Sequence, residues 1–282
     1  MRIICMELRY FTPRPDIRRY VRAYYYYATP APAIQPLCAE LGNIRILLDG
    51  AGRLRLPGGG RADIKAAFLI GPTMGAYTMD AAGPTEVFGV GISPHGWGAM
   101  LGVNADEAAD RVFSLTDFGG AVADAFVEDI GNASNNAERV RIADRFFARL
   151  LGRRADKTLR YPHALDRWLL DPNDLKLDQL IETMDLSRRQ TDRLAKQFFG
   201  ASPKLLQRKY RALRAADRIR AGLTDWFAAA GSAYYDQSHF IKEFKTFMGV
   251  TPHQFATNQA ELISRIQLLR RAPAIRLPLA SL

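Results

Sequence analysis

Two short segments of the chain carry basic, hydroxyl and amide side chains at helical spacing, and side chains of these types can contact phosphate groups and base edges. The outer face of residues 187–203, "SRRQTDRLAKQFFGASP", is formed by Arg189, Arg193 and Lys196. The matching face of residues 236–252, "DQSHFIKEFKTFMGVTP", is formed by Ser238, Lys242 and Lys245. The inner face of the second segment carries aromatic residues at i, i+4 and i+7: Phe240, Phe244 and Phe247. These faces predict two helices that anchor to a small core and present a cationic side outward.

The elements that position these side chains repeat after 49 residues. Ser187 aligns with Asp236, and both residue types are good N-caps. Gly200 aligns with Gly249, where a helix needs a left-handed residue to end. A Ser-Pro or Thr-Pro pair then starts the next helix in each copy. A further short helix is predicted before each copy, at residues 177–184 and 224–231. Short helix, tight turn and second helix form the helix-turn-helix plan, in which the second helix enters the major groove of DNA.

His239 in the second segment raises the alternative of a metal or catalytic site. It has no cysteine and no second histidine at ligand spacing, so a polar side chain near a helix start is the favoured interpretation. The chain has two cysteines, Cys5 and Cys38, which are too few for a disulfide framework or a thiolate zinc site. The sequence therefore predicts no catalytic residue, no metal and no cofactor.

The basic charge of the chain is concentrated in its second half. The net charge is +10, and residues 1–155 carry 18 basic against 16 acidic side chains, whereas residues 156–271 carry 20 against 13. Between residues 187 and 220 there are 11 basic residues, opposed only by Asp192 and Asp217. Such a patch suits a polyanion. The alternative is a protein-interaction module whose basic face is solvated.

The first 95 residues predict a β-rich region. Short apolar runs separated by Gly, Pro and Asp clusters occur at residues 19–28, 43–49, 64–71 and 85–93. The segment "LPGGGR" (residues 56–61) predicts a hairpin loop, because it lacks the Gly-Lys-Ser/Thr ending of a phosphate loop.

Helical periodicity begins after residue 93. Capping boxes are predicted at Asn104 with Glu107 and at Asn135 with Glu138. The second box is followed by an apolar stripe at helical spacing: Ile142, Ala143, Phe146, Phe147, Leu150 and Leu151. This stripe predicts either an intramolecular packing face or the seam of a homodimer.

The segments "LSRRQTDRLAKQFFGASP" and "YYDQSHFIKEFKTFMGVTPHQF" resemble the AraC/XylS family of bacterial transcription regulators. The resemblance covers residues 165–255 and implies a seven-helix DNA-binding domain, in which a long helix at residues 203–220 joins two helix-turn-helix units. Eighteen residues at 1.5 Å each span about 27 Å. Two recognition helices so joined can reach successive major grooves, one DNA turn of roughly 34 Å apart.

The resemblance implies base-reading roles for three residues of the first recognition helix and four of the second. Nearby cations would contact phosphates. The full candidate DNA-binding set is Arg188, Arg189, Asp192, Arg193, Lys196, Gln237, Ser238, His239, Lys242 and Lys245. On the linker helix, Lys209 and Arg211 are expected to meet at most a phosphate or solvent. Thr191 and Ala195 stand where the family usually has large apolar residues, and Ala233 replaces a glycine, so looser packing of the first unit is expected.

The first 120 residues resemble, more weakly, an N-terminal domain of uncharacterised family members, through "YVRAYYYY", "LIGP" and "FGVGISPHGWGAMLGV". The family implies that this domain senses a small ligand or mediates dimerisation. Four aromatic residues could line a ligand pocket, although a core role is favoured: Tyr25, Tyr27, Tyr77 and Trp97.

The sequence predicts an α+β protein with a β-rich N-terminal domain (residues 1–120), a helical connector (121–160), an all-α DNA-binding domain with two helix-turn-helix units (161–260) and a C-terminal extension (261–282). The predicted function is sequence-specific, DNA-binding transcriptional regulation in the cytoplasm, with double-stranded DNA as the partner. A small-molecule effector, RNA polymerase and a second copy of the chain stay open as further partners, and the ligand-binding residues are unknown. No apolar run reaches the roughly 18 residues of a membrane span. The alternative function is a DNA-targeted enzyme, such as a repair protein that uses the same module.

Overall fold

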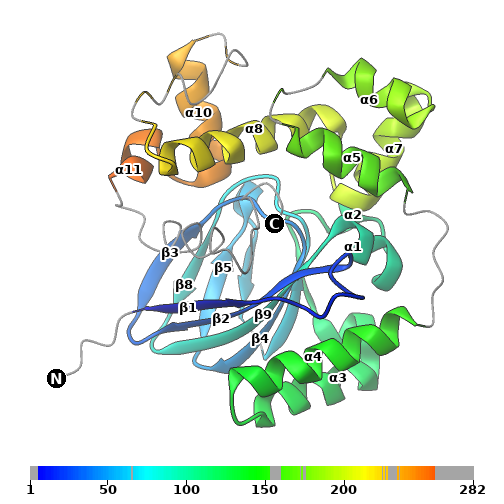
Figure 1. Ribbon diagram of the computed structural model, residues 1–282. Helices are drawn as coiled ribbons and strands as arrows, with labels where there is room; N and C mark the ends of the chain where they lie inside the picture. Colours follow the sequence, from blue (N-terminus) through cyan, green and yellow to red (C-terminus); the bar gives the residue numbers. More distant parts are fainter. Residues whose placement is uncertain are drawn as a thin grey trace.

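The structure is a computed structural model that describes residues 6–64, 66–152, 160–171, 173, 176–223, 225, 227, 234 and 236–257. A β-rich N-terminal part occupies the middle of the molecule, two helices lie below it and a helical C-terminal part lies across its top (Figure 1). The predicted α+β fold class is therefore confirmed.

Two antiparallel sheets form the β-rich part. The six-stranded sheet has the order β1 (Glu7–Phe11), β2 (Val21–Thr29), β9 (Thr85–Ile92), β4 (Asn43–Asp49), β7 (Ala67–Ile70) and β10 (Val112–Ser114). The four-stranded sheet has the order β3 (Ala33–Leu37), β8 (Tyr77–Ala81), β5 (Gly52–Arg55) and β6 (Arg61–Asp63). Between β5 and β6 the chain turns through a short 3-10 helix (Pro57–Gly59), which confirms the predicted hairpin loop.

The six-stranded sheet is buried on both faces, which explains the near-continuous apolar runs of its central strands. Along β9, Val87 packs into the core between the two sheets, whereas Phe88 and Val90 pack on the opposite side. Strand β4 spans the predicted residues 43–49. The strand predicted at residues 64–71 is shorter, because Ile64 instead continues the β5–β6 hairpin by donating its N–H to Gly52 O at 2.8 Å.

Helices cover the outer face of the six-stranded sheet. They are α1 (Pro94–Met100), α2 (Ala105–Ala108), α3 (Leu115–Asn132) and α4 (Asn136–Leu151). The inner side of α4 joins the sheet core, where the Tyr24 ring lies 5.9 Å from Phe88 and 6.4 Å from Phe147. Asn135 caps α4 as predicted, but the Glu138 carboxylate accepts from the Ser134 N–H at 2.8 Å and not from Asn135, so the reciprocal half of the predicted capping box is absent there. Asn104 donates its amide to Glu107 Oε1 instead of capping α2. The described part of the predicted connector therefore packs on the N-terminal sheet.

The C-terminal part consists of α5 (Arg160–Leu170), α6 (Leu177–Met184), α7 (Arg188–Phe199), α8 (Pro203–Arg220), α10 (Gln237–Met248) and α11 (Pro252–Ala256). One small core joins α5, α6, α7 and the first half of α8. A second core joins the last half of α8 to α10 and α11. The helix predicted at residues 224–231 falls almost wholly outside the described residues, and Ala233 and the extension predicted at 261–282 lie outside them too.

Candidate nucleic-acid interface

Local hydrogen bonds fix both ends of α7. The Ser187 hydroxyl accepts from the Gln190 backbone N–H at 3.3 Å, and Gln190 Oε1 accepts from the Ser187 N–H at 2.9 Å. Gly200 ends the helix with φ +86°, a left-handed conformation that suits glycine. Thr191 and Ala195 are fully buried, and the Thr191 hydroxyl donates to Ser187 O at 3.1 Å. The predicted helix and its inner face are therefore present.

The outward face of α7 presents Arg189, Arg193 and Lys196, all exposed. Asp192 lies beside them and pairs with Lys196 at 2.8 Å, and its hydrogen bond raises the pKa of that ammonium. Arg188 pairs with Asp178 of α6 at 3.0 Å. Because these pairs are largely exposed, they contribute little to stability and are readily exchanged for phosphate contacts.

Helix α10 repeats the arrangement. Asp236 Oδ1 caps the helix by accepting from the His239 N–H at 2.7 Å, and Gly249 ends it with φ +77°. The aromatic stripe faces inward, with exposed fractions of 1% or less for Phe240, Phe244 and Phe247. The outward residues are all exposed: Gln237, Ser238, His239, Lys242 and Lys245. The two predicted faces of the second segment are therefore confirmed.

A buried carboxylate on α10 was missed by the sequence analysis. Glu243 is 5% exposed and accepts a hydrogen bond from Arg208 Nε of α8 at 2.6 Å, which ties the second recognition helix to the linker helix. His239 Nε2 lies 3.9 Å from the same carboxylate. The sequence did contain one signal for this contact: His239 and Glu243 stand at i and i+4, so their side chains are neighbours on one face of a helix.

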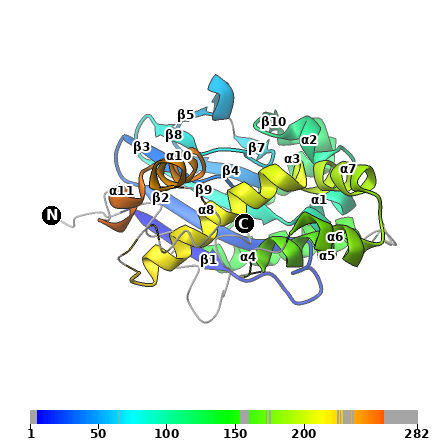
Figure 2. The same ribbon diagram turned by 90° about the horizontal axis from the view of Figure 1, so that it is seen from above.

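The two recognition helices stand at the two ends of α8. In Figure 1, α8 runs across the top of the sheets, with α10 at its left and α7 behind it at its right. Seen from above in Figure 2, α8 runs diagonally over the sheets, between α10 and α7. The structure thus brings the candidate residues into two groups, one on each helix, separated by the length of the linker helix.

The prediction made for Lys209 is wrong. The expectation was a linker residue that meets a phosphate or solvent, but its side chain is 1% exposed and points into the N-terminal domain. Its Nζ donates hydrogen bonds to Glu40 O at 2.7 Å and Thr73 O at 2.9 Å. Burial lowers the pKa of this ammonium to about 8. Lys209 therefore cannot contact DNA in this arrangement.

The N-terminal domain also reaches the outward side of α7. Asn104 and Asp106, at the start of α2, line a hollow of about 590 Å³ whose other wall includes Arg189, Arg193 and Lys196. A carboxylate of the N-terminal domain therefore lies beside the cationic face of the first recognition helix.

Within the described residues, no group of three or more His, Cys, Asp or Glu side chains is placed to hold a metal ion. Of the aromatic residues considered for a ligand pocket, Tyr27, Tyr77 and Trp97 are buried and Tyr25 is half-buried. No helix in the described part of the chain is both long and apolar enough to span a membrane.

Two family matches cover most of the chain. Residues 180–258 match the helix-turn-helix domain family. Residues 9–114 match a domain of unknown function, DUF6597. No curated protein matches the chain.

Solved structures with similar folds include the regulator ToxT. The chain is 10% identical to ToxT from Vibrio cholerae, with a TM-score of 0.49, covering 83% of this chain and 97% of that one. A ToxT structure with bound unsaturated fatty acid is 11% identical, with a TM-score of 0.49, covering 82% and 93%. A putative ethanolamine utilization protein Q from Salmonella typhimurium is 18% identical, with a TM-score of 0.26, covering 31% and 69%.

Paired helix-turn-helix units with cationic recognition helices define a DNA-binding protein. The family match places this pair in the AraC-type helix-turn-helix domain. The chain is a DNA-binding transcriptional regulator with an AraC-type helix-turn-helix domain in its C-terminal part and a DUF6597 domain in its N-terminal part.

Proposed function

We propose that α7 and α10 enter successive major grooves on one side of a DNA duplex and read a two-part site. The observation that supports this is the pairing of two capped helices with matching cationic outer faces at the two ends of one linker helix. The 18 residues of α8 span about 27 Å at 1.5 Å per residue. With the width of the recognition helices added, this suits one DNA turn of roughly 34 Å.

Within this proposal, base edges are contacted from the exposed face of each helix. The base-reading residues are Arg189, Asp192 and Arg193 on α7, and Gln237, Ser238, His239 and Lys242 on α10. The remaining candidates lie at the borders of these faces, where they contact phosphates: Arg188, Lys196 and Lys245. Arginine can bond a guanine edge through two hydrogen bonds, whereas the amide of glutamine suits adenine.

The test is binding to duplex DNA across a salt series, using fragments selected from a genomic pool and scrambled versions of them. We expect affinity for both to fall steeply with salt, because each phosphate contact releases condensed counterions, with a slope of about −0.9 per contact. We also expect tighter binding to the selected fragments at every salt concentration. An affinity that does not change with salt concentration, or equal affinity for selected and scrambled duplexes, would contradict the proposal.

The proposed function is regulatory and not catalytic. A repair enzyme that transfers groups to a thiol needs a reactive, accessible cysteine. Cys38 is 1% exposed and packs among Leu213, Phe240 and Phe244 in the core of the second unit, and Cys5 lies outside the described residues. These surroundings favour a structural thiol over a nucleophile.

The remaining partners are assigned by role. We place sensing of a small-molecule effector in the N-terminal domain, with the effector's identity open. Contact with RNA polymerase stays a prediction, as does a cytoplasmic location.

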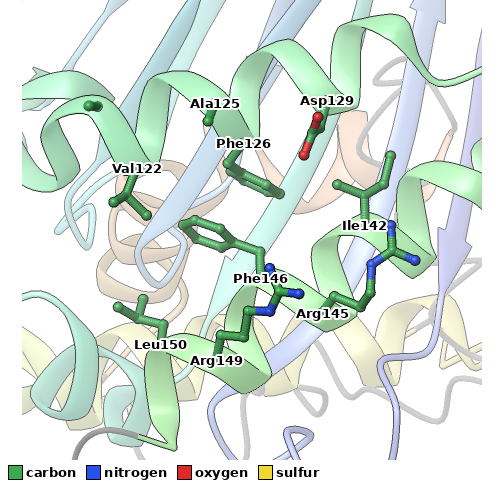
Figure 3. Close-up of a pocket in the computed structure, with 10 residues that line it drawn as sticks. Val122, Ala125, Phe126, Asp129, Ile142, Arg145, Phe146, Arg149 and Leu150 are labelled. Carbon is green, nitrogen blue, oxygen red and sulfur yellow. The ribbon is translucent and has the colours of Figure 1, made fainter.

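A second copy of the chain fits the surface between α3 and α4. There the rings of Phe126 and Phe146 face each other with centroids 4.0 Å apart, beside Val122 and Leu150 (Figure 3). Val122 is 64% exposed.

The same surface carries charges of both signs, since Asp129 lies opposite Arg145 and Arg149 (Figure 3). In a two-fold symmetric dimer, the same surface patch of each copy meets its counterpart. A patch that carries positive and negative side chains around an apolar centre can therefore form ion pairs with its own copy. We therefore propose a homodimer through α3 and α4.

Replacing Phe146 with aspartate is expected to convert this dimer to a monomer, because two carboxylates would meet in an apolar seam. The measurement is molar mass by light scattering, with circular dichroism to confirm that the variant is folded. Ile34→Asp is the control, since Ile34 is an apolar residue 63% exposed on β3, away from this surface. A folded Phe146→Asp protein with the wild-type dimer mass would rule out the seam.

A further inference from the structure

Two loops of the N-terminal domain cross from one sheet to the other beneath α8. Residues 38–42 connect β3 to β4, and residues 71–76 connect β7 to β8. We call these segments the crossover loops. They are hydrogen-bonded to each other, since Thr73 Oγ1 accepts from the Glu40 N–H at 2.8 Å and Glu40 O accepts from the Thr73 N–H at 3.1 Å. Both connections between the two sheets therefore form one hydrogen-bonded unit at this end of the domain.

Lys209 is inserted between the crossover loops. Its ammonium donates to one backbone carbonyl of each loop, Glu40 O and Thr73 O, and it is fully buried. An ammonium taken out of water loses its hydration, and an apolar side chain at such a position is often at least as stabilising. The role of Lys209 is therefore not mainly stability. Its directional hydrogen bonds to two fixed carbonyls favour one position of α8 on the N-terminal domain.

The crossover loops also complete the end of α10. The last carbonyls of a helix have no partner within it. Here Phe247 O accepts from the Ala39 N–H at 2.7 Å, and Thr246 O accepts from the Ala76 N–H at 2.8 Å. Gly249 follows against the same loops, where an added Cβ would lie 3.1 Å from Ala76 Cβ. The second recognition helix is therefore bonded through its backbone to the N-terminal domain.

The end of α7 is seated in a similar way on α1 and α2. The Phe198 ring lies on Gly98, where an added Cβ would come within 2.3 Å of the ring. Gly200 lies against Ala105, with its would-be Cβ 3.1 Å from Ala105 O. Both recognition helices thus rest on the N-terminal domain by their C-terminal ends, and their N-terminal ends point away from it (Figure 1).

The crossover loops are connected to the interior of the sheets through Glu40. Its carboxylate is buried and accepts hydrogen bonds from Arg45 of β4 at 3.1 Å and from the Tyr77 hydroxyl of β8 at 2.9 Å. Its backbone carbonyl is one of the two that accept hydrogen bonds from Lys209. A single residue therefore joins the space between the two sheets to the linker helix of the DNA-binding domain.

We propose that Lys209 is a positioning residue that locks α8 onto the crossover loops, so that the N-terminal domain fixes the orientation of both recognition helices toward DNA. Helix α8 sets the distance between the two units. Each unit also packs on α8 through a small core of its own, and the chain turns at Gly200 and Gly222, both with positive φ, on either side of α8. The contacts with the crossover loops add a constraint from the N-terminal domain, and the consequence for DNA rests on the proposed function.

The test uses the full chain and two readouts. The first is hydrogen exchange at the Ala39 and Ala76 amides, which donate to the last carbonyls of α10. Their exchange reports, without DNA, on the seat, by which we mean the contact of α8 and α10 with the crossover loops. The second is the preference for a selected two-part site over the same site with two base pairs inserted between its halves. Lys209→Met keeps the length of the side chain but removes the donor. Thr73→Val keeps the shape of the side chain and removes one of the two hydrogen bonds between the crossover loops, the one that the Thr73 hydroxyl accepts from the Glu40 N–H, without touching α8. Arg141→Met, an exposed cation on α4, is the control.

We expect both variants to exchange the two amides about tenfold faster or more, because the seat opens locally. We also expect their spacing preference to fall by about fivefold or more, as a lost coupling between domains predicts. Wild-type exchange and wild-type spacing preference in both variants would overturn the proposal, and if Lys209→Met does not fold, Thr73→Val decides it. If the wild-type protein does not distinguish selected from scrambled DNA, the proposed function fails, and the exchange readout still tests the seat.

Discussion

Replacing Phe244 with alanine is expected to lower the free energy of unfolding by about 3–5 kcal/mol, the usual cost of removing a fully buried phenylalanine ring. Phe244 is 0% exposed, and its ring makes edge contacts with Phe240 at 5.6 Å and Phe255 at 5.5 Å. It joins α10, α11 and α8 in one small core, whose other large side chains include Phe240, Met248 and Phe255. The measurement is chemical denaturation, with DNA binding as a second readout that we expect to be lost.

Ile34→Ala is the control for this prediction, because it removes an apolar side chain that is already 63% exposed. We expect a change within about 0.5 kcal/mol for that variant. A Phe244→Ala protein destabilised by less than about 1 kcal/mol would mean that the second unit closes around the missing ring, and that the packing of α10 is not what holds it in place.

Replacing Arg193 with alanine is expected to weaken binding to the selected site by about 1–3 kcal/mol, the discrimination that one bidentate contact to guanine provides. Affinity for scrambled DNA should barely change. Arg193 lies one turn beyond Arg189 on the exposed face of α7, and in the described part of the chain it forms no ion pair that would hold it away from a base. The measurement is affinity for selected and scrambled duplexes at one fixed salt concentration.

Arg141→Ala is the matched control, since Arg141 is an exposed arginine on α4, and this helix lies on the opposite side of the sheets from α8 (Figure 1). An equal loss on both duplexes would make Arg193 a phosphate contact and place the reading face elsewhere on α7. No loss on either would mean that the first unit stays out of the groove, and that α10, with Lys242 and His239, provides the specificity.

The helix ends of the DNA-binding domain could be predicted from the sequence because they are set by local chemistry. Ser187 and Asp236 cap their helices, and Gly200 and Gly249 end them, as the repeat indicated. Each of these signals needs only a few neighbouring residues. The short strands β1, β3, β5, β6, β8 and β10 were missed, because strands of three to five residues with polar positions carry little periodicity.

The role of Lys209 could not be predicted in this way, because its partners Glu40 and Thr73 lie 169 and 136 residues away in the chain. One signal was available. Lys209 stands three residues after Leu206 and four before Leu213, so it falls on the apolar stripe of α8 and not on its polar face. A lysine on an apolar stripe indicates a buried partner, but the sequence does not say which one.

The position of Cys38 has a consequence for the evolution and engineering of such regulators. This residue belongs to the N-terminal domain, yet it packs in the core of the second helix-turn-helix unit. A chimera that joined residues 160–257 to a foreign sensor would expose the surface that Cys38 covers and leave the last carbonyls of α10 without donors. We therefore expect the DNA-binding half to be less stable on its own, and a foreign sensor would have to supply matching contacts at both places.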